Sequence, residues 1–273
     1  MTESMRAVGP LPGHGFVRVT GADATDFLQS MFSADIAALS PGSSVLTGWH
    51  DARGRVQACV RVAERDGEFW LVLPAPLSAG LCDGLSRYIL RSKVKLQPAG
   101  ETLMAAGVVV AGGRYEIYAE RASLQARLEQ HYADGVPRLD DATWELGDIR
   151  DGLPAVYNET IGSFTAQMLN LDRIGGVSFT KGCYPGQEII ARTHHLGTPK
   201  RRMMRFVSTA GEIPTAGSKL LDDSGKAAGV VVRAAAATDS RECLVVTQVN
   251  RTTPLFDTDE TAWRPATLPY LLS

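Results

Sequence analysis

The pattern of apolar and polar positions first predicts a helix near the start of the chain. Residues 22–32 place their apolar side chains at the spacing of one helix face, namely at Ala24, Phe27, Leu28 and Met31. Asp23 immediately precedes this face and stands where a helix cap is expected.

The pattern then predicts two cycles of strand, strand and helix. Residues 56–62 alternate apolar and polar positions, and residues 69–73 form a short apolar run, as two strands would. Leucine then recurs every four residues from Leu77 to Leu85, with Ile89 continuing the series, as in a helix. The second cycle has expected strands at 107–111 and 115–119 and an expected helix at 123–132.

Beyond residue 200 the pattern changes to short strands alone. Glycine, proline and aspartate turns separate the expected strands at 205–208, 228–233 and 243–249. Closely spaced strands of this kind are typical of a small barrel. We therefore expect an α+β protein with a domain boundary near residue 200 and a C-terminal β-barrel.

Composition narrows the class of protein. The 273 residues are 44% hydrophobic and 21% charged, which is ordinary for a globular chain with a real core. The formal net charge of -2 gives no global reason to expect nucleic acid or an anionic membrane as a partner. Residues 1–16 lack the pattern of a secretory signal, and no apolar run reaches the roughly 18 residues of a membrane helix. We expect a soluble, cytoplasmic protein, or a protein of the mitochondrial matrix if the source is eukaryotic.

The cysteines do not form a metal-binding pattern. Four of them lie far apart and include no C-x-x-C pair, at Cys59, Cys82, Cys183 and Cys243. Zinc sites and locally held clusters need closely spaced thiolates. We therefore expect no metal site in this chain.

One segment carries candidate chemistry. Residues 177–179 fit a strand, residues 182–186 force a turn, and Gln187 can begin a helix. Cys183 would then lie in a strand-to-helix turn, where nearby positive charge and a helix N-terminus favour the thiolate. Lys181 shares one face with Cys183 if the backbone is extended. The alternative is that Cys183 is a small buried hydrophobe.

The same segment carries a family resemblance. Residues 181–188 read K-G-C-Y-P-G-Q-E and resemble the K-G-C-Y-x-G-Q-E motif of the YgfZ family, a branch of the folate-binding glycine-cleavage T-protein superfamily. The continuation is similar to the mitochondrial iron–sulfur assembly factors of that family. Further similar segments span nearly the whole chain, at 21–23, 27–29, 51–55, 191–197, 200–202 and 268–270.

The resemblance implies a fold of three subdomains around a central cleft. We expect residues 1–45 and 101–200 to form a discontinuous folate-binding core. Residues 46–100 would form an α+β subdomain, and residues 201–273 the barrel.

The resemblance also implies a function. Members of the family bind tetrahydrofolate and support the assembly, maintenance or repair of iron–sulfur clusters in client enzymes, some of which modify tRNA. The expected cofactor is tetrahydrofolate or a derivative, and the expected partners are iron–sulfur client or assembly proteins, without a membrane or direct nucleic-acid contact. Our hypothesis for the chemistry is a transient thiol contact by Cys183, activated by Lys181.

The resemblance suggests where folate binds. Residues 144–152 resemble the segment that lines the pterin pocket, and Trp144 could stack on the ring or simply pack in the core. Arg150 stands where several relatives have glutamate, and arginine only donates hydrogen bonds. The full set of expected folate contacts is Trp144, Asp148, Arg150, Tyr184, Gln187, Glu188 and Arg192.

Departures from the T-protein pattern leave two alternatives open. The catalytic aspartate of the T-protein aligns with Ala58 or Cys59, so the carboxylate of aminomethyl transfer is missing. We therefore do not expect a turnover enzyme; if there is one, it is a folate-dependent one-carbon transferase. The second alternative is a non-catalytic scaffold whose basic loop recruits a partner, with folate as a passive stabiliser. The basic segment 192–205 is either a solvated loop or a docking site for the folate tail, an acidic protein or an RNA backbone.

Overall fold

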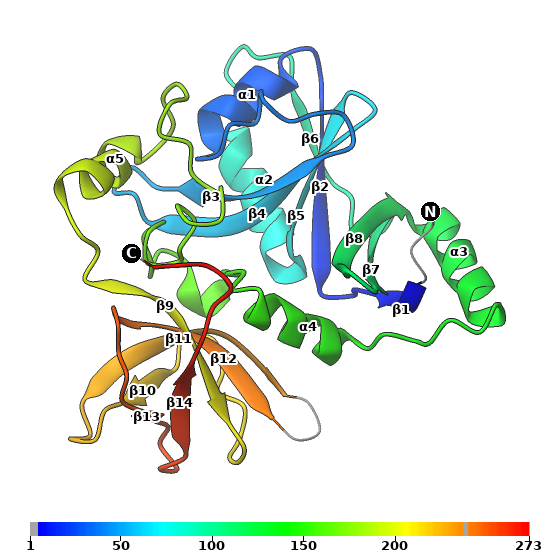
Figure 1. Cartoon of the computed structure of the whole chain (residues 1–273). Helices are drawn as coiled ribbons and strands as arrows, with labels where there is room; N and C mark the ends of the chain where they lie inside the picture. Colours follow the sequence, from blue (N-terminus) through cyan, green and yellow to red (C-terminus); the bar gives the residue numbers. More distant parts are fainter. Residues whose placement is uncertain (1–4, 237–239, 273) are drawn as a thin grey trace.

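The described part of the chain forms two antiparallel sheets and a closed barrel (Figure 1). The computed structural model describes residues 5–236 and 240–272. The helices are α1 (Ala24–Met31), α2 (Ser78–Ser86), α3 (Arg121–Ala133), α4 (Asp141–Arg150) and α5 (Gln187–Leu196), with short 3-10 turns η1 (Ala75–Leu77) and η2 (Asn158–Thr160). The strands are β1 (Met5–Pro10), β2 (His14–Thr20), β3 (Ser44–His50), β4 (Val56–Arg65), β5 (Glu68–Pro74), β6 (Lys95–Pro98), β7 (Leu103–Val110), β8 (Gly113–Glu120), β9 (Arg201–Ser208), β10 (Lys219–Leu221), β11 (Ala227–Ala236), β12 (Arg241–Gln248), β13 (Leu255–Phe256) and β14 (Ala262–Ala266).

The two sheets stack as inner layers between helices, and we call this part the sheet body. The larger sheet has the order β3-β4-β5-β2-β6 and the smaller one β1-β7-β8. Side chains alternate along β5: Leu71 packs in the core with α1 and α2, whereas Trp70 and Val72 pack toward the smaller sheet. On the far side of the smaller sheet, Val108 packs against Leu124 of α3. The strand predicted at 69–73 is thus buried on both faces.

The C-terminal strands close into the barrel that the pattern predicts. The strand order is β10-β11-β12-β9-β14-β13, and the interior is filled by a cluster that includes Phe206 and Trp263. The expected α+β class and the expected C-terminal barrel are confirmed. Helix α4 lies between the sheet body and the barrel (Figure 1).

Three local expectations differ from the structure. Asp23 precedes α1 but makes no capping hydrogen bond, because its carboxylate accepts from the Lys93 main-chain N–H at 2.7 Å. No strand forms at 177–179, since residues 161–186, all described, contain no regular element. Strand β2 lies inside the sheet of β3–β6, so the expected division at residue 45 does not follow a sheet boundary. The division of the chain into functional units stays a prediction.

The irregular segment before α5 is nevertheless well ordered by hydrogen bonds. Gln167 and Asn170 are buried, and their amide nitrogens donate to the main-chain oxygens of Ile190 and Met203, both at 2.8 Å. Buried polar groups satisfied in this way allow a long connection to cross the interior. Within the described ranges, no helix combines the length and the apolar character of a membrane span.

Candidate functional site

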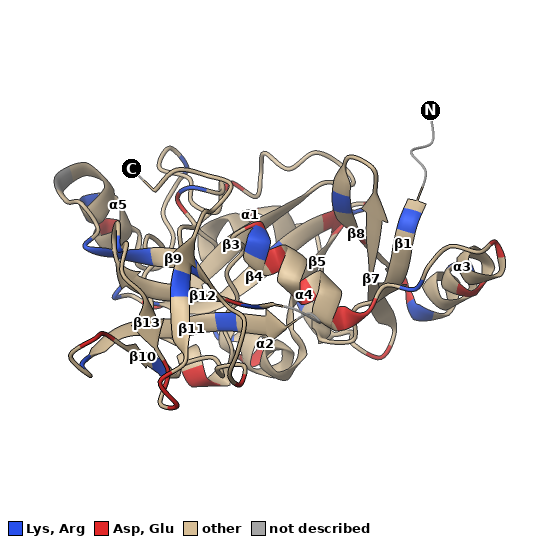
Figure 2. Cartoon of the chain, turned by 60° about the horizontal axis from the view of Figure 1, so that its bottom comes forward, with Lys and Arg blue, Asp and Glu red and all other residues tan. Residues whose placement is uncertain are grey.

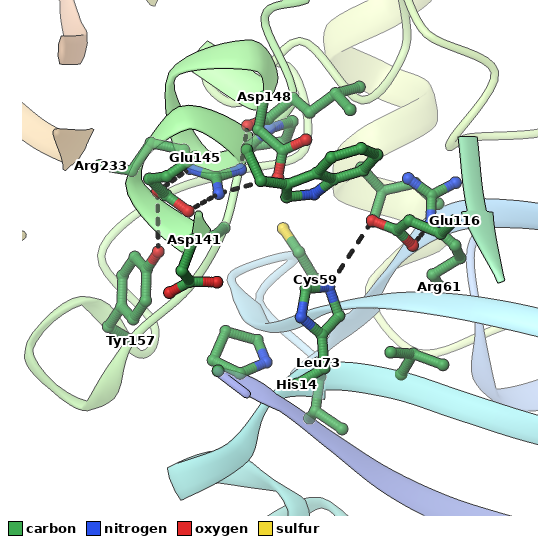
Figure 3. Close-up of a pocket in the computed structure, with 18 residues that line it drawn as sticks. His14, Cys59, Arg61, Leu73, Glu116, Asp141, Glu145, Asp148, Tyr157 and Arg233 are labelled. Carbon is green, nitrogen blue, oxygen red and sulfur yellow. Dashed lines mark hydrogen bonds and ion pairs between the residues drawn. The ribbon is translucent and has the colours of Figure 1, made fainter. Parts of the chain in front are cut away.

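A central cavity of about 250 Å³ opens where the two sheets, α4 and the barrel strand β11 meet (Figure 3). Its wall combines apolar side chains such as Leu73 with a group of ionisable ones. The ionisable members are His14, Cys59, Arg61, Glu116, Asp141, Glu145, Asp148, Tyr157 and Arg233. A second cavity of about 290 Å³ adjoins it and shares Arg61, Glu116, Trp144, Asp148 and Leu153 with its lining. Cavities of this size with a few converging polar groups are typical ligand sites.

Helix α4 supplies the densest part of the wall. Asp140 caps the helix by accepting from the Thr143 main-chain N–H at 2.8 Å, which fixes where the helix begins. Trp144 and Asp148 are four residues apart and therefore lie on one face of the helix. Both face the cavities, and their contact with folate stays a prediction.

Ion pairs hold this face of α4 to two other elements. Arg233 of β11 donates to Glu145 and, at 2.9 Å, to Asp148. Arg114 of β8 donates to the other oxygen of Asp148 at 2.6 Å. Burial acts to raise the pKa of Asp148, but the two guanidinium groups outweigh it and lower that pKa. Asp148 is therefore a fixed negative charge in the cavity wall.

Trp144 presents an unused hydrogen-bond donor. Its side chain is 4% exposed, and its indole N–H has no partner among the described residues. The Arg114 guanidinium lies over the ring, 4.4 Å from its centroid, and the Gly107 backbone is so close that a Cβ there would lie 2.4 Å from Cε3. Much of the ring surface is thus already in contact with protein. The donor is what Trp144 has left for a ligand.

Cys59 is one of the two residues, with Ala58, that align with the carboxylate of the T-protein pattern. The structure places it in the cavity wall, as one of the two residues expected there. Burial raises the pKa of its thiol to about 12, although the charge of Arg233 acts to lower it. The thiol is therefore protonated at neutral pH and does not serve as a base.

The opposite wall carries residues that the sequence did not single out. The His14 Nε2 lies 3.6 Å from a Glu116 oxygen, and the Arg61 Nε lies 3.3 Å from the other (Figure 3). Asp141 points toward the cavity and makes no hydrogen bond within the described chain, and burial raises its pKa (Figure 3). His14 and Glu116 lie on separate strands and form no local motif, so nothing in the sequence pattern marks them. Glu145 lies inside the expected pterin segment, so the sequence alone could have indicated it as a site residue.

The K-G-C-Y segment lies elsewhere, and its lysine faces inward. The Lys181 ammonium donates to three main-chain oxygens at the end of α1, those of Gln29, Phe32 at 2.6 Å and Ala34 at 2.8 Å. Three acceptors use all three N–H groups of an ammonium. Burial lowers the pKa of Lys181 to about 8, with Asp35 acting in the opposite direction. Lys181 therefore has no donor left for Cys183, so a hydrogen bond to the thiol is not formed, and activation of the thiol by the lysine charge stays a prediction.

Cys183 and Tyr184 point to opposite environments. Cys183 is exposed, unlike the other three cysteines, and all four are free. Tyr184 is buried, its hydroxyl has no partner in the described chain, and burial raises its pKa to about 12. Cys183 is thus not the buried hydrophobe of the alternative, and its role as a reactive thiol stays a prediction.

The remaining expected folate contacts lie outside the cavities described above. Arg150 points away from the central cavity and pairs with Glu242 of the barrel at 2.7 Å. Gln187, Glu188 and Arg192 lie on α5, and neither they nor Tyr184 line the central cavity or its neighbour. We therefore retain only Trp144 and Asp148 as candidate contacts.

The basic segment 192–205 divides into paired and free charges. Arg202 is buried and pairs with both oxygens of Asp172 at 2.9 Å. Arg205 pairs with Glu242 at 2.8 Å. Arg192, Lys200 and Arg201 are exposed and make no ion pair within the described ranges. Among the described residues, no group of three or more His, Cys, Asp or Glu side chains is arranged to hold a metal ion.

Comparisons with known proteins place these features in context. No family model matches the sequence. The chain is 34% identical over 206 residues to an uncharacterized protein of Haemophilus influenzae, covering 72% of this chain and 71% of the relative. It is 28% identical over 253 residues to the tRNA-modifying protein YgfZ of Yersinia pestis, covering 80% and 77%. A protein of the same name from Edwardsiella ictaluri is 28% identical over 254 residues, with the same coverage.

A solved structure shows the same fold. The aminomethyltransferase T of the glycine cleavage system from Bartonella henselae superimposes with a TM-score of 0.76, covering 99% of this chain and 88% of that one. The two sequences are 14% identical, so this likeness concerns the fold alone. It confirms the expected T-protein-like arrangement.

Proposed function

Because the chain belongs to the YgfZ family of T-protein-like proteins, we propose that it binds tetrahydrofolate or a derivative in the central cavity. The family expected from the K-G-C-Y segment is thereby confirmed. We further propose that the protein is an accessory factor for the assembly, maintenance or repair of iron–sulfur clusters in client enzymes. These would include enzymes of tRNA modification, the process named for the Yersinia relative.

The observation that carries the folate proposal is the donor and acceptor set around Trp144. A pterin ring is flat and carries N–H donors beside a carbonyl acceptor. The unpartnered indole N–H suits an acceptor, and the carboxylates of Asp148 and Asp141 suit donors. The two adjoining cavities of about 250 and 290 Å³ give room for the ring and part of the tail.

The residues of this chain would hold the folate without acting on it. The charges of Asp148 and Arg233 are fixed by ion pairs, so they orient a ring at little cost in reorganisation. When bound, the reduced folate would supply ring nitrogens that can carry a one-carbon unit. Cys59, with a pKa of about 12, cannot act as the base of aminomethyl transfer in place of the missing aspartate. This thiol favours an accessory role over the transferase alternative.

The proposal can be tested by titrating 5-formyltetrahydrofolate into the protein in a calorimeter. Asp148→Asn removes the acceptor charge, and we expect the affinity to fall by about tenfold or more. Asp141→Asn, at the exposed cavity rim, should weaken binding without risk to folding. Arg150→Gln is the matched control, since Arg150 faces Glu242 and should leave the affinity unchanged. Absence of binding by the parent contradicts the folate proposal, and so does binding by both aspartate variants that is as tight as binding by the parent.

The role of the exposed thiol needs a cellular test. We propose that Cys183 makes a transient contact with a client, its cluster or a partner, because it is the accessible cysteine of the four. A bacterium lacking its own YgfZ should regain aconitase-type or tRNA-thiolating activity with the parent chain and not with Cys183→Ser. Cys82→Ala, at a buried cysteine of α2, is the control and should rescue. Equal rescue by Cys183→Ser makes that thiol dispensable.

A further inference from the structure

A third cavity, here called the α5 cavity, lies on a different side of the chain from the folate proposal. It has a volume of about 420 Å³ and is formed by the segment 167–173, the end of α5 and the connection to β9. The turn after β12 and Leu272 complete it. It shares no lining residue with the central cavity or its neighbour within the described chain. Its size is in the range of small-molecule sites.

The charges of the α5 cavity leave one cation uncompensated. Asp172 is its carboxylate, and both oxygens accept from Arg202 at 2.9 Å. Arg173 lies beside them and is 35% exposed. Among the described residues its guanidinium donates one hydrogen bond, to the Leu272 main-chain oxygen at 3.4 Å, and its distance to Asp172 is 3.8 Å. Because Arg202 already neutralises Asp172, Arg173 has donors and charge available for an anion.

An aromatic surface borders the same cavity. The His194 ring stacks on Phe179, with centroids 3.7 Å apart and an interplanar angle of 15°. His194 lines the cavity and Phe179 does not, so Phe179 backs the ring from outside. Asn250, which also lines the cavity, is exposed and makes no side-chain hydrogen bond within the described residues. The His195 ring packs edge-on against His194, with centroids 4.9 Å apart. An aromatic ring beside a free amide is a combination that proteins use to bind a nucleobase.

The surrounding surface is basic although the whole chain is not. Arg192, Lys200 and Arg201 are exposed and lie on α5, on the connection and at the start of β9. Figure 2 shows basic positions gathered where α5 leads into β9. The chain as a whole carries a net charge of -2, so this concentration is local. Exposed cations around a cavity favour phosphate groups.

We propose that the α5 cavity binds a nucleotide, with the phosphate at Arg173 and the base against His194. The nucleotide is either free or part of a single-stranded RNA. The expectation against nucleic-acid contact rested on the net charge of the chain, and the local arrangement of charge replaces it. The site is independent of the central cavity, so it stands whether or not folate binds there.

The test uses adenosine 5′-monophosphate, adenosine and a short fluorescein-labelled single-stranded RNA as probes. Calorimetry follows the two small molecules, and fluorescence anisotropy follows the RNA. We expect Arg173→Gln to weaken binding by about tenfold and His194→Ala by about fivefold. Arg264→Gln is the matched control, because Arg264 is an exposed arginine of β14 that lines none of the three cavities. Thermal unfolding verifies that each variant is folded.

Each outcome decides the proposal. Binding of the monophosphate, weaker for adenosine and for the two cavity variants, supports a free nucleotide. Binding of RNA alone with the same variant pattern supports a nucleotide within a chain. Absence of binding by all probes overturns the proposal, as does RNA binding that falls equally in Arg264→Gln. A folate titration on the same samples separates the two sites, since Arg173→Gln should bind folate like the parent.

Discussion

His50 is a buried ionisable side chain that is neutral in the folded protein at neutral pH. It is 2% exposed, and neither ring nitrogen has a partner among the described residues. Burial lowers its pKa to about 4, against a smaller opposing effect of Asp51. Between pH 6.5 and 4 the unfolded chain binds a proton at this residue and the folded chain does not. The protonation of His50 therefore leaves the free energy of unfolding unchanged above pH 6.5 and lowers it as the pH falls from 6.5 toward 4.

This gives a prediction for a histidine variant. His50→Leu should remove about 3 kcal/mol of pH-dependent stability between pH 6.5 and 4. Urea unfolding at pH 7 and at pH 4.5 measures the difference. His195→Asn, at an exposed histidine of α5, should keep the pH dependence of the parent. The same pH dependence in parent and His50→Leu would show that this histidine is not the group responsible.

Lys181 is predicted to stabilise a turn and leave the neighbouring thiol unaffected. Lys181→Met leaves three main-chain oxygens at the end of α1 without their donor, which should lower the free energy of unfolding by about 2 kcal/mol. The rate at which iodoacetamide alkylates Cys183 at neutral pH should stay within about twofold of the parent, since no donor of Lys181 reaches the thiol. Lys200→Met is the exposed control for both measurements. A large fall in the alkylation rate of the folded Lys181→Met protein would support activation by the lysine charge.

The sequence shows which residues of this segment matter but not how they act. The K-G-C-Y letters identify Lys181 and Cys183 because they form a contiguous motif. The partner oxygen of Ala34 is 147 residues away in the chain, so only the folded structure brings it to the ammonium. His14 and Glu116 of the central cavity meet in the same way. Such contacts join residues that are far apart in the chain, so no local spacing in the sequence reveals them.

At the scale of elements, α5 is held by a contact between two glycine turns. Gly186 precedes the helix with φ of 78°, and a Cβ there would lie 2.6 Å from the Asp51 main-chain oxygen and 2.7 Å from the Gly54 Cα. Gly182, four residues earlier, has no atom of the described residues within 4 Å of its would-be Cβ. The hairpin between β3 and β4 therefore fixes where α5 begins.

Two alanine substitutions test this contact. Gly186→Ala should lower the free energy of unfolding by about 2–4 kcal/mol, because it adds both backbone strain and a clash. Gly182→Ala should change it by less than about 0.5 kcal/mol, since it has neither. Urea unfolding measures both variants. Equal stability of the two would mean that the hairpin yields to the added methyl group.

Periodicity predicts elements whose apolar face packs in a core, and fails for α4. The helix expected at 22–32 forms as α1 because its apolar positions all face one core. Glu145 and Asp148 of α4 line the central cavity, whereas Arg150 donates to Glu242 of the barrel. A helix that makes ion pairs on several sides has no apolar stripe to detect. Helix α4, which supplies much of the candidate site, is thus a helix that the hydrophobic periodicity does not predict.

In the whole molecule, ion pairs through α4 connect the barrel to the sheet body. Arg233 of β11 donates to Glu145 and Asp148 of α4, and also to the Leu153 main-chain oxygen at 3.0 Å. Arg150 of α4 reaches back to Glu242 of β12. The central cavity lies at this junction, so its shape depends on the two parts staying together. The candidate ligand site therefore lies beside the ion pairs that join the barrel to α4.

Removing Arg233 should therefore weaken both stability and coupling. Arg233→Met leaves Glu145 without its partner, and the loss of one member of a buried ion pair costs about 3–5 kcal/mol. The double variant Arg233→Met with Glu145→Met leaves no charge uncompensated at that pair, since Asp148 keeps Arg114, and should regain at least about half of that loss. Urea unfolding followed by fluorescence and by circular dichroism should give coincident curves for the parent and separated curves for Arg233→Met. Arg264→Met should unfold like the parent, and coincident curves in the Arg233 variant would mean that apolar packing alone couples the barrel to the sheet body.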